Sequence, residues 1–140
     1  MRRRIMIIFG IVFITVMAFI PGCGSKTTTT ATTPVEPSYA GVITDNILAA
    51  IAEDNYGKLS QDFDQAMKDG LPEAAFQGLR SQLQDGAGDY VSKKFNDIVV
   101  QGEITTVVYI AKYTKVERVS IIISFRTVDG QNQVAGLYFQ

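Results

Sequence analysis

Few side chains in this sequence could do chemistry, and their types limit what that chemistry could be. The 140-residue chain has one cysteine, Cys23, and no histidine. Without histidine there is no Ser-His or Cys-His activation of a nucleophile, no imidazole general base and no imidazole ligand for zinc. We therefore expect a non-catalytic protein without a metal site or a cofactor.

Carboxylates are the remaining groups for acid-base or metal chemistry. Asp62, Asp64 and Asp69 lie close in sequence, but positions 62 and 64 point to different sides of a helix, and no calcium-loop spacing follows. Residues 85–89, Asp-Gly-Ala-Gly-Asp, are Gly-rich like a phosphate-binding loop, yet they follow a helical segment and have no Lys-Ser or Lys-Thr after them. These patterns indicate solvated helix charges and a turn, so an enzyme using carboxylates is only the third alternative.

Tyrosines could line a ligand site, because the ring gives apolar contact and the hydroxyl gives a hydrogen bond. The candidates for a small-ligand pocket are Tyr56, Tyr90, Tyr109, Tyr113 and Tyr138. The alternative is that each ring packs at the edge of the core and leaves its hydroxyl in water.

Residues 1–22 have the pattern of a signal peptide. Three arginines at positions 2–4 precede an apolar run of 16 residues, which Pro21 and Gly22 close. The run is shorter than the roughly 20 residues that span a bilayer. We predict a cleaved secretory signal, with an uncleaved membrane anchor as the alternative.

The end of this signal surrounds the cysteine. Ile20-Pro21-Gly22-Cys23 resembles the lipobox of bacterial and archaeal lipoproteins, with Pro21 in place of the usual small or apolar residue. The resemblance implies that the Cys23 thiol carries diacylglycerol and that the signal is cut just before it. Because two acyl chains give stable anchoring, we expect an extracytoplasmic lipoprotein held at the membrane of a prokaryotic cell envelope.

Residues 23–40 comprise this cysteine and a segment that we expect to be a flexible tether. Residues 24–40 contain six threonines and two prolines, with little apolar surface to bury. The threonines could instead carry sugars. Three of the thirteen Lys and Arg residues lie in the signal, so ten remain against fourteen Asp and Glu. This acidic balance argues against a nucleic-acid partner.

Residues 41–140 are expected to form one small α+β domain, because apolar residues recur first at helical and then at strand spacing. The helical segments start near Thr44 or Asp45, near Leu59 and near Pro72. Strand composition follows over 90–100, 104–113 and 117–128, and a fourth strand comes after the turn signal Asp129-Gly130. We predict amino-terminal helices packed on one face of a four-stranded antiparallel meander.

The strand pattern also predicts a register. A two-residue turn at Thr114-Lys115 would place Ile104 opposite Phe125 and Val108 opposite Ile121, with both pairs on the apolar face. The other, mixed face would then carry Val107, Tyr109 and Ile122. For the last strand two patterns stay open: a literal Asp129-Gly130 turn, or a bulge. The first turns Val134, Gly136 and Tyr138 to the core, and the second turns Ala135, Leu137 and Phe139.

Three segments of the chain carry a family resemblance. DNYGKL, then DFDQAMKDGLP, and finally VAGLYF in the last strand resemble the small domains named domain of unknown function 3887, within the nuclear transport factor 2-like superfamily. The resemblance covers essentially all of residues 41–140. It implies a curved sheet that wraps the helices into a cone, sometimes with an apolar pocket and often with pairing through the sheet. It assigns no catalytic residue.

Two functions of different classes follow. The first is a lipoprotein domain that binds a small apolar ligand or another envelope protein without catalysis. The second is a structural or assembly module that forms a homodimer through the face carrying Val107, Tyr109 and Ile122. A closed cavity lined by tyrosines would favour the first, and a flat exposed patch would favour the second.

Overall fold

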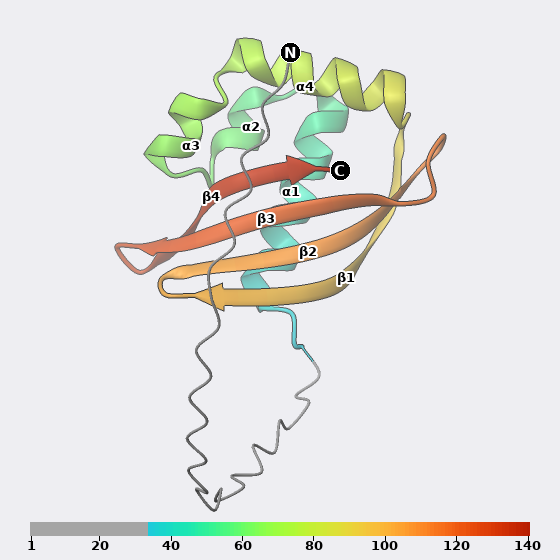
Figure 1. Ribbon diagram of the computed structural model, residues 1–140. Helices are drawn as coiled ribbons and strands as arrows, with labels where there is room; N and C mark the ends of the chain where they lie inside the picture. The colour runs from blue at the N-terminus through green and yellow to red at the C-terminus, as the bar shows by residue number, and fades with distance from the viewer. Residues whose placement is uncertain (1–33) are drawn as a thin grey trace, which may run out of the picture. The chain divides into compact units, whose positions relative to one another are not determined.

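A computed structural model describes residues 34–140, shown in Figure 1. The predicted signal peptide, Cys23 and the tether residues 24–33 lie outside this range. Within it, no helix combines the length and apolar character needed to cross a bilayer. Four helices precede four strands, which confirms the α+β class and the order of elements.

Helix α1, Ser38–Glu53, begins earlier than the sequence predicted. Pro37 precedes its first residue in extended conformation, and Thr44 donates a hydrogen bond from Oγ1 to the Ala40 carbonyl over 2.6 Å instead of capping the helix. The start is fixed by packing, because Ala40 is fully buried and the Tyr39 ring meets Phe125 edge to face at 5.2 Å. The boundary of the tether at residue 40 was therefore wrong, since residues 38–40 belong to the helix.

The second predicted helix is two helices, α2, Tyr56–Ser60, and α3, Gln65–Gly70. Between them the chain pairs with the last strand: Val134 N donates to Asp62 O over 2.7 Å, and Asp64 N donates to Val134 O over 2.9 Å. Phe63 is buried at this bridge. A continuous helix would use these backbone groups internally, so the bridge breaks it.

Helix α4, Glu73–Gly86, follows Pro72, and Phe76 is its one buried residue. It passes into strand β1, Tyr90–Gln101, which is followed by β2, Ile104–Tyr113, β3, Val119–Val128, and β4, Gln131–Phe139. The strands form one antiparallel sheet in the order β1-β2-β3-β4, as predicted. In Figure 1 the sheet is curved, α1 crosses one face of it, and α2, α3 and α4 gather on the β4 side.

The predicted register of β2 and β3 was wrong by one residue. Tyr109 lies opposite Ile121, and Ile104 lies opposite Arg126. The connection between these strands covers residues 114–118 and is closed by Tyr113 N donating to Val116 O over 2.9 Å, so it is longer than the two-residue turn expected. A one-residue change of register turns every side chain of one strand to the other face.

Strand β2 therefore presents alternate residues to the core: Val107, Tyr109, Ala111 and Tyr113. Strand β3 turns the expected residues to the core: Val119, Ile121, Ile123 and Phe125. In β4 both predicted patterns occur in succession, because a bulge at Ala135 lies between the pairs Phe125 with Val134 and Ser124 with Gly136. Val134 is buried before the bulge, and after it Leu137 and Phe139 pack against the core.

Candidate functional site

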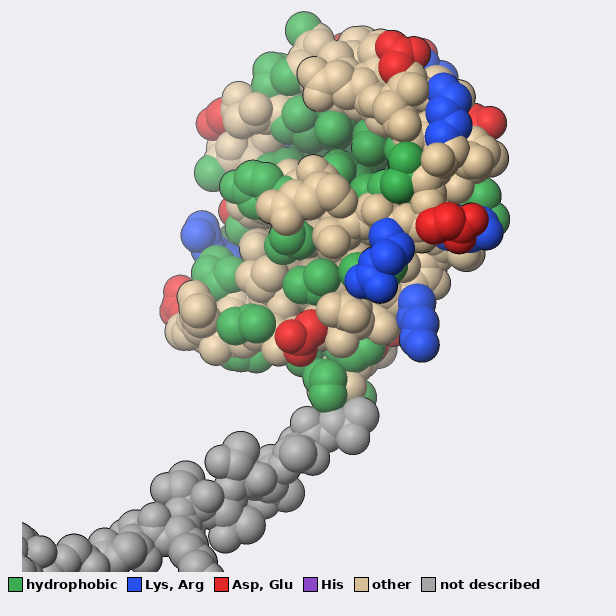
Figure 2. All heavy atoms as spheres, turned by 45° about the vertical axis from the view of Figure 1, so that its right-hand side comes forward, with side chains coloured by type: hydrophobic (Ala, Val, Ile, Leu, Met, Phe, Trp, Pro, Cys, Tyr) green, Lys and Arg blue, Asp and Glu red, His purple; other side chains and the backbone are tan. Residues whose placement is uncertain are grey.

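A cavity of about 570 Å³ opens between α1, α4 and the ends of β1 and β2 nearest to α4. Its floor is apolar, with Leu48 and Ile51 of α1 and Leu83 of α4. Figure 2, which brings this side of the molecule forward, shows apolar side chains gathered in a hollow of the surface. The volume falls within the roughly 300–1,000 Å³ of small-molecule sites.

Tyr113 brings a polar group to this apolar wall. It is the last residue of β2, its side chain is only 3% exposed, and its hydroxyl has no hydrogen-bond partner among the described protein groups. Its ring meets the ring of Tyr90 edge to face at 5.8 Å, since the two residues are paired across β1 and β2. Burial raises the pKa of Tyr113 to about 12. The hydroxyl is therefore protonated near neutral pH and can donate a hydrogen bond.

Tyr90, the partner of Tyr113 across β1 and β2, also lines the cavity. Burial raises its pKa above the ordinary tyrosine value, and the negative charge of Asp45 adds to the rise. The hydroxyls of both tyrosines are therefore protonated and neutral at physiological pH.

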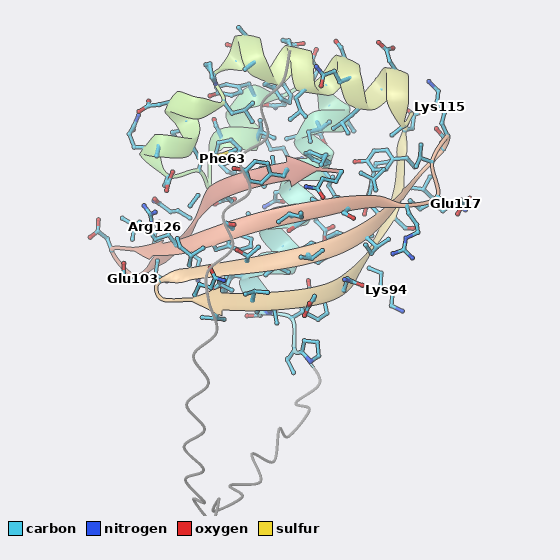
Figure 3. All side chains as sticks on the ribbon, viewed as in Figure 1. Phe63, Lys94, Glu103, Lys115, Glu117 and Arg126 are labelled. Atoms are coloured by element: carbon cyan, nitrogen blue, oxygen red, sulfur yellow. The ribbon has the colours of Figure 1, made fainter. Side chains whose placement is uncertain are left out.

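One end of the cavity is held by a clasp between the β2–β3 hairpin and the α4–β1 turn. Asp89 N donates to Thr114 Oγ1 over 2.9 Å, and Lys115 N donates to Ala87 O over 2.9 Å. The Lys115 ammonium also donates to two carbonyls of the last turn of α4, at 3.0 and 3.1 Å. Figure 3 shows Lys115 at the hairpin, beside the end of α4. These bonds fix the backbone on both sides of the wall.

Gly88 is essential to the clasp geometry. Its φ is +83°, and a Cβ there would collide with Thr114 Oγ1. The Gly-rich segment 85–89, which the sequence predicted to be a turn, forms the end of α4 and this part of the wall.

The charged side chains that line the cavity already have partners. Arg80 donates from Nε to the Ile51 carbonyl over 3.0 Å and lies 3.8 Å from the Asp54 carboxylate. Asp45 pairs with Lys93 at 2.7 Å. Asp89 accepts a hydrogen bond from the Gln84 amide over 2.9 Å.

The structure brings together only two of the five candidate tyrosines, Tyr90 and Tyr113. Tyr56 donates to the Leu71 carbonyl over 2.9 Å, where it joins α2 to the end of α3. Tyr109 is buried in β2 and donates to Glu36, which precedes α1. Tyr138 is 61% exposed. These three tyrosines do not line the cavity.

The predicted interface was misplaced as well. Val107 and Tyr109 are 0% and 1% exposed and face the core, because the register differs by one residue. Ile122 does lie on the outer face, opposite Val108 in β2 and Tyr138 in β4. The outer face therefore has a different apolar row from the one expected.

The candidate carboxylates form no joint site. Asp64 is buried as the cap of α3, where its Oδ1 accepts from Met67 N over 2.7 Å, and Asp69 accepts from Gln65 on the surface. Within residues 34–140 no three metal-ligating side chains cluster.

Sequence reasoning missed most of the cavity. Leu48, Ile51 and Leu83 were read as core residues, and Arg80 and Gln84 were not singled out. The one local signal was Gly88, because two glycines between a helix and a strand allow a close backbone approach.

The architecture defines an α+β domain in which helices cover one face of an open antiparallel meander, with a cavity between the helices and one end of the sheet. Residues 44–137 match the family described as "Protein of unknown function (DUF3887)", and the chain belongs to this family. A comparison with curated proteins finds no match.

Proposed function

We propose that this protein is a lipoprotein of the cell envelope whose domain binds a small, largely apolar molecule in the cavity between α1 and α4, without catalysis. The observation that carries the proposal is that Tyr113 lines the cavity and that its buried hydroxyl has no hydrogen-bond partner among residues 34–140. Buried polar groups in native proteins nearly always have a hydrogen-bond partner. A ligand that enters the cavity can supply it, and the clasp at Thr114 and Lys115 holds the wall ready for it.

The lipoprotein part of the proposal rests on the sequence around Cys23. A lipid on that thiol would keep the domain at the membrane, where apolar molecules concentrate. This location suits a cavity whose floor is apolar.

The binding proposal is tested by filling the cavity. Ala52 lies at its rim on α1 and is exposed, so Ala52→Phe would block the opening without disturbing the core. Ala74→Phe is the matched control, on the exposed surface of α4 outside the cavity. We expect native mass spectrometry and thermal-shift screening with apolar compounds to detect ligands on the wild type and Ala74→Phe but not on Ala52→Phe. Equal binding by all three would refute the proposal.

The outer face of the sheet supports a second candidate, a homodimer. Val108, Ile122 and Tyr138 lie in one row across β2, β3 and β4, and Tyr138 is 61% exposed. A second copy packed on this row would bury it. Sedimentation of the wild type and of Ile122→Lys tests this candidate: a dimer that the substitution converts to a monomer is expected, and a wild-type monomer excludes it.

A further inference from the structure

We infer that the molecule held in the cavity is uncharged, and that it presents a hydrogen-bond acceptor to the Tyr113 hydroxyl from an otherwise apolar body. The inference rests on the proposed function, which it narrows to a class of ligand. It follows from which polar and charged groups of the cavity wall already have partners and which one does not.

Each charged side chain of the cavity wall already has a hydrogen-bond or ion-pair partner. Three charged side chains line the cavity, Asp45, Arg80 and Asp89. Asp45 is paired with Lys93 at 2.7 Å, and Asp89 accepts from the Gln84 amide. A charged ligand would have to lose its water and then compete with these existing partners, which is unfavourable in a partly buried site.

An anionic ligand would need Arg80 as its partner, but this side chain already contacts the end of α1. Its Nε donates to Ile51 O, a carbonyl in the last turn of α1, and its Nη1 lies 3.8 Å from Asp54 Oδ2. Asp54 in turn accepts from the Gln77 amide over 2.7 Å. Together these contacts join α4 to the end of α1. Redirecting Arg80 to a ligand would leave the Ile51 carbonyl without this donor.

What the wall does offer is a neutral donor in apolar surroundings. Leu48 and Ile51 are 2% and 8% exposed, and Leu83 and the Tyr90 ring complete the apolar surface. Among the described residues, the Tyr113 hydroxyl is the one buried side-chain polar atom without a partner. A carbonyl or ether oxygen on an apolar frame satisfies it, with no charge to desolvate.

A charge series of rigid probes tests the inference on the purified full-length protein. Acetylnaphthalene, naphthoate and naphthylmethylamine share one ring system and are neutral, anionic and cationic. Fluorescence titration should show acetylnaphthalene binding at least about tenfold more tightly than either charged probe. In Tyr113→Phe, which keeps the ring and removes the hydroxyl, its affinity should fall about five- to tenfold. Tyr39→Phe, outside the cavity, should leave it unchanged.

The outcomes distinguish a failure of the inferred ligand class from a failure of the proposed binding function. Tightest binding by naphthoate or by naphthylmethylamine, or an unchanged affinity of acetylnaphthalene in Tyr113→Phe, overturns the inference and leaves the binding function standing. Binding by none of the three probes, or binding that Ala52→Phe does not weaken, overturns both.

Discussion

The hydroxyl of Tyr109 donates a hydrogen bond to Glu36 Oε1 over 2.6 Å, and so ties the segment before α1 to the centre of the sheet. Tyr109 is 1% exposed, and its pKa lies well above the ordinary value because of burial and the Glu36 hydrogen bond. The Lys93 ammonium lies 5.0 Å from the centre of the same ring and pairs with Asp45 of α1. Glu36, which precedes α1, is therefore already part of the packed domain.

The first prediction concerns this bond. Glu36→Ala should lower the free energy of unfolding by about 1–3 kcal/mol, because it leaves a buried hydroxyl without a partner. Tyr109→Phe should cost about 1 kcal/mol, since it removes the donor along with the bond. Urea denaturation of both variants and of the double variant measures the coupling free energy between Glu36 and Tyr109.

The double variant should be no less stable than Glu36→Ala, because neither side chain then lacks a partner. Glu53→Ala is the control: Glu53 makes an exposed pair with Lys58, so its removal should change stability by at most about 0.5 kcal/mol. Fully additive losses at Glu36 and Tyr109 would contradict the coupling.

The second prediction is a loss of stability at alkaline pH. In the unfolded chain a tyrosine titrates near pH 10, whereas burial holds the folded pKa of Tyr113 at about 12. Below pH 10 the hydroxyl is protonated in both states. Between about pH 10 and 12 only the unfolded chain ionises, so stability falls as pH rises, by up to about 1.4 kcal/mol per pH unit.

Urea denaturation at a series of pH values from 9 to about 11.5 measures this slope. Tyr113→Phe should make the slope shallower, because it removes one of the three tyrosines, Tyr90, Tyr109 and Tyr113, whose folded pKa is raised. Tyr138→Phe is the control, since that side chain is 61% exposed. An identical slope in the wild type and Tyr113→Phe would contradict the buried position of the hydroxyl.

The third prediction tests the clasp through Gly88. Gly88→Ala combines a positive φ with a collision against Thr114 Oγ1, so we expect a loss of more than about 2 kcal/mol. Gly130 also has positive φ, +79°, but nothing lies near its missing Cβ. Gly130→Ala should therefore cost only about 1 kcal/mol, and the difference between the two melting temperatures measures the collision. Equal losses would show that the clasp tolerates a side chain.

The fourth prediction concerns Asp64, which joins the break in the helical segment to the sheet. Its carboxylate accepts from Met67 N over 2.7 Å and lies 3.7 Å from Arg126, and the residue is 6% exposed. Asp64→Ala should cost about 1–3 kcal/mol through loss of the cap and an unpaired amide. Asp64→Asn, which keeps an acceptor, should cost less, and exposed Asp69→Ala should stay within about 0.5 kcal/mol. Equal losses for the alanine and asparagine variants would exclude the cap as the cause.

The sequence predicted those parts of the fold that depend on local pattern. The helical stripe containing Ile47 and Ile51 and the β-branched strands followed from side-chain periodicity, which burial imposes directly. The register failed because it depended on the length of one hairpin, and the loop after Tyr113 is set by its contacts with Ala87 and Asp89, which are distant in sequence.

The cavity was not predicted from the sequence, for a related reason. Its wall combines Leu48, Leu83 and Tyr113, from two helices and the end of a strand, and each of these residues has an ordinary core pattern in its own element. Only the packing of α4 against the β2–β3 hairpin leaves a space between them. Likewise, Phe63 fits a helical stripe, but its pairing with Val134 overrides the local preference.

The last prediction concerns attachment to the membrane. If Cys23 is lipidated, a clickable palmitate analogue should label the wild type, and Cys23→Ala should lose all labelling because the chain has no second thiol. Ser25→Ala, two residues away, should label like the wild type. Mass spectrometry of the labelled protein should show a chain that begins at Cys23, since the lipobox resemblance implies a cut just before this residue. Labelling that persists in Cys23→Ala would place the lipid elsewhere. A wild type that carries no label would remove the reason for placing an apolar cavity beside a membrane, while the titrations of Tyr113→Phe would still decide what the cavity binds.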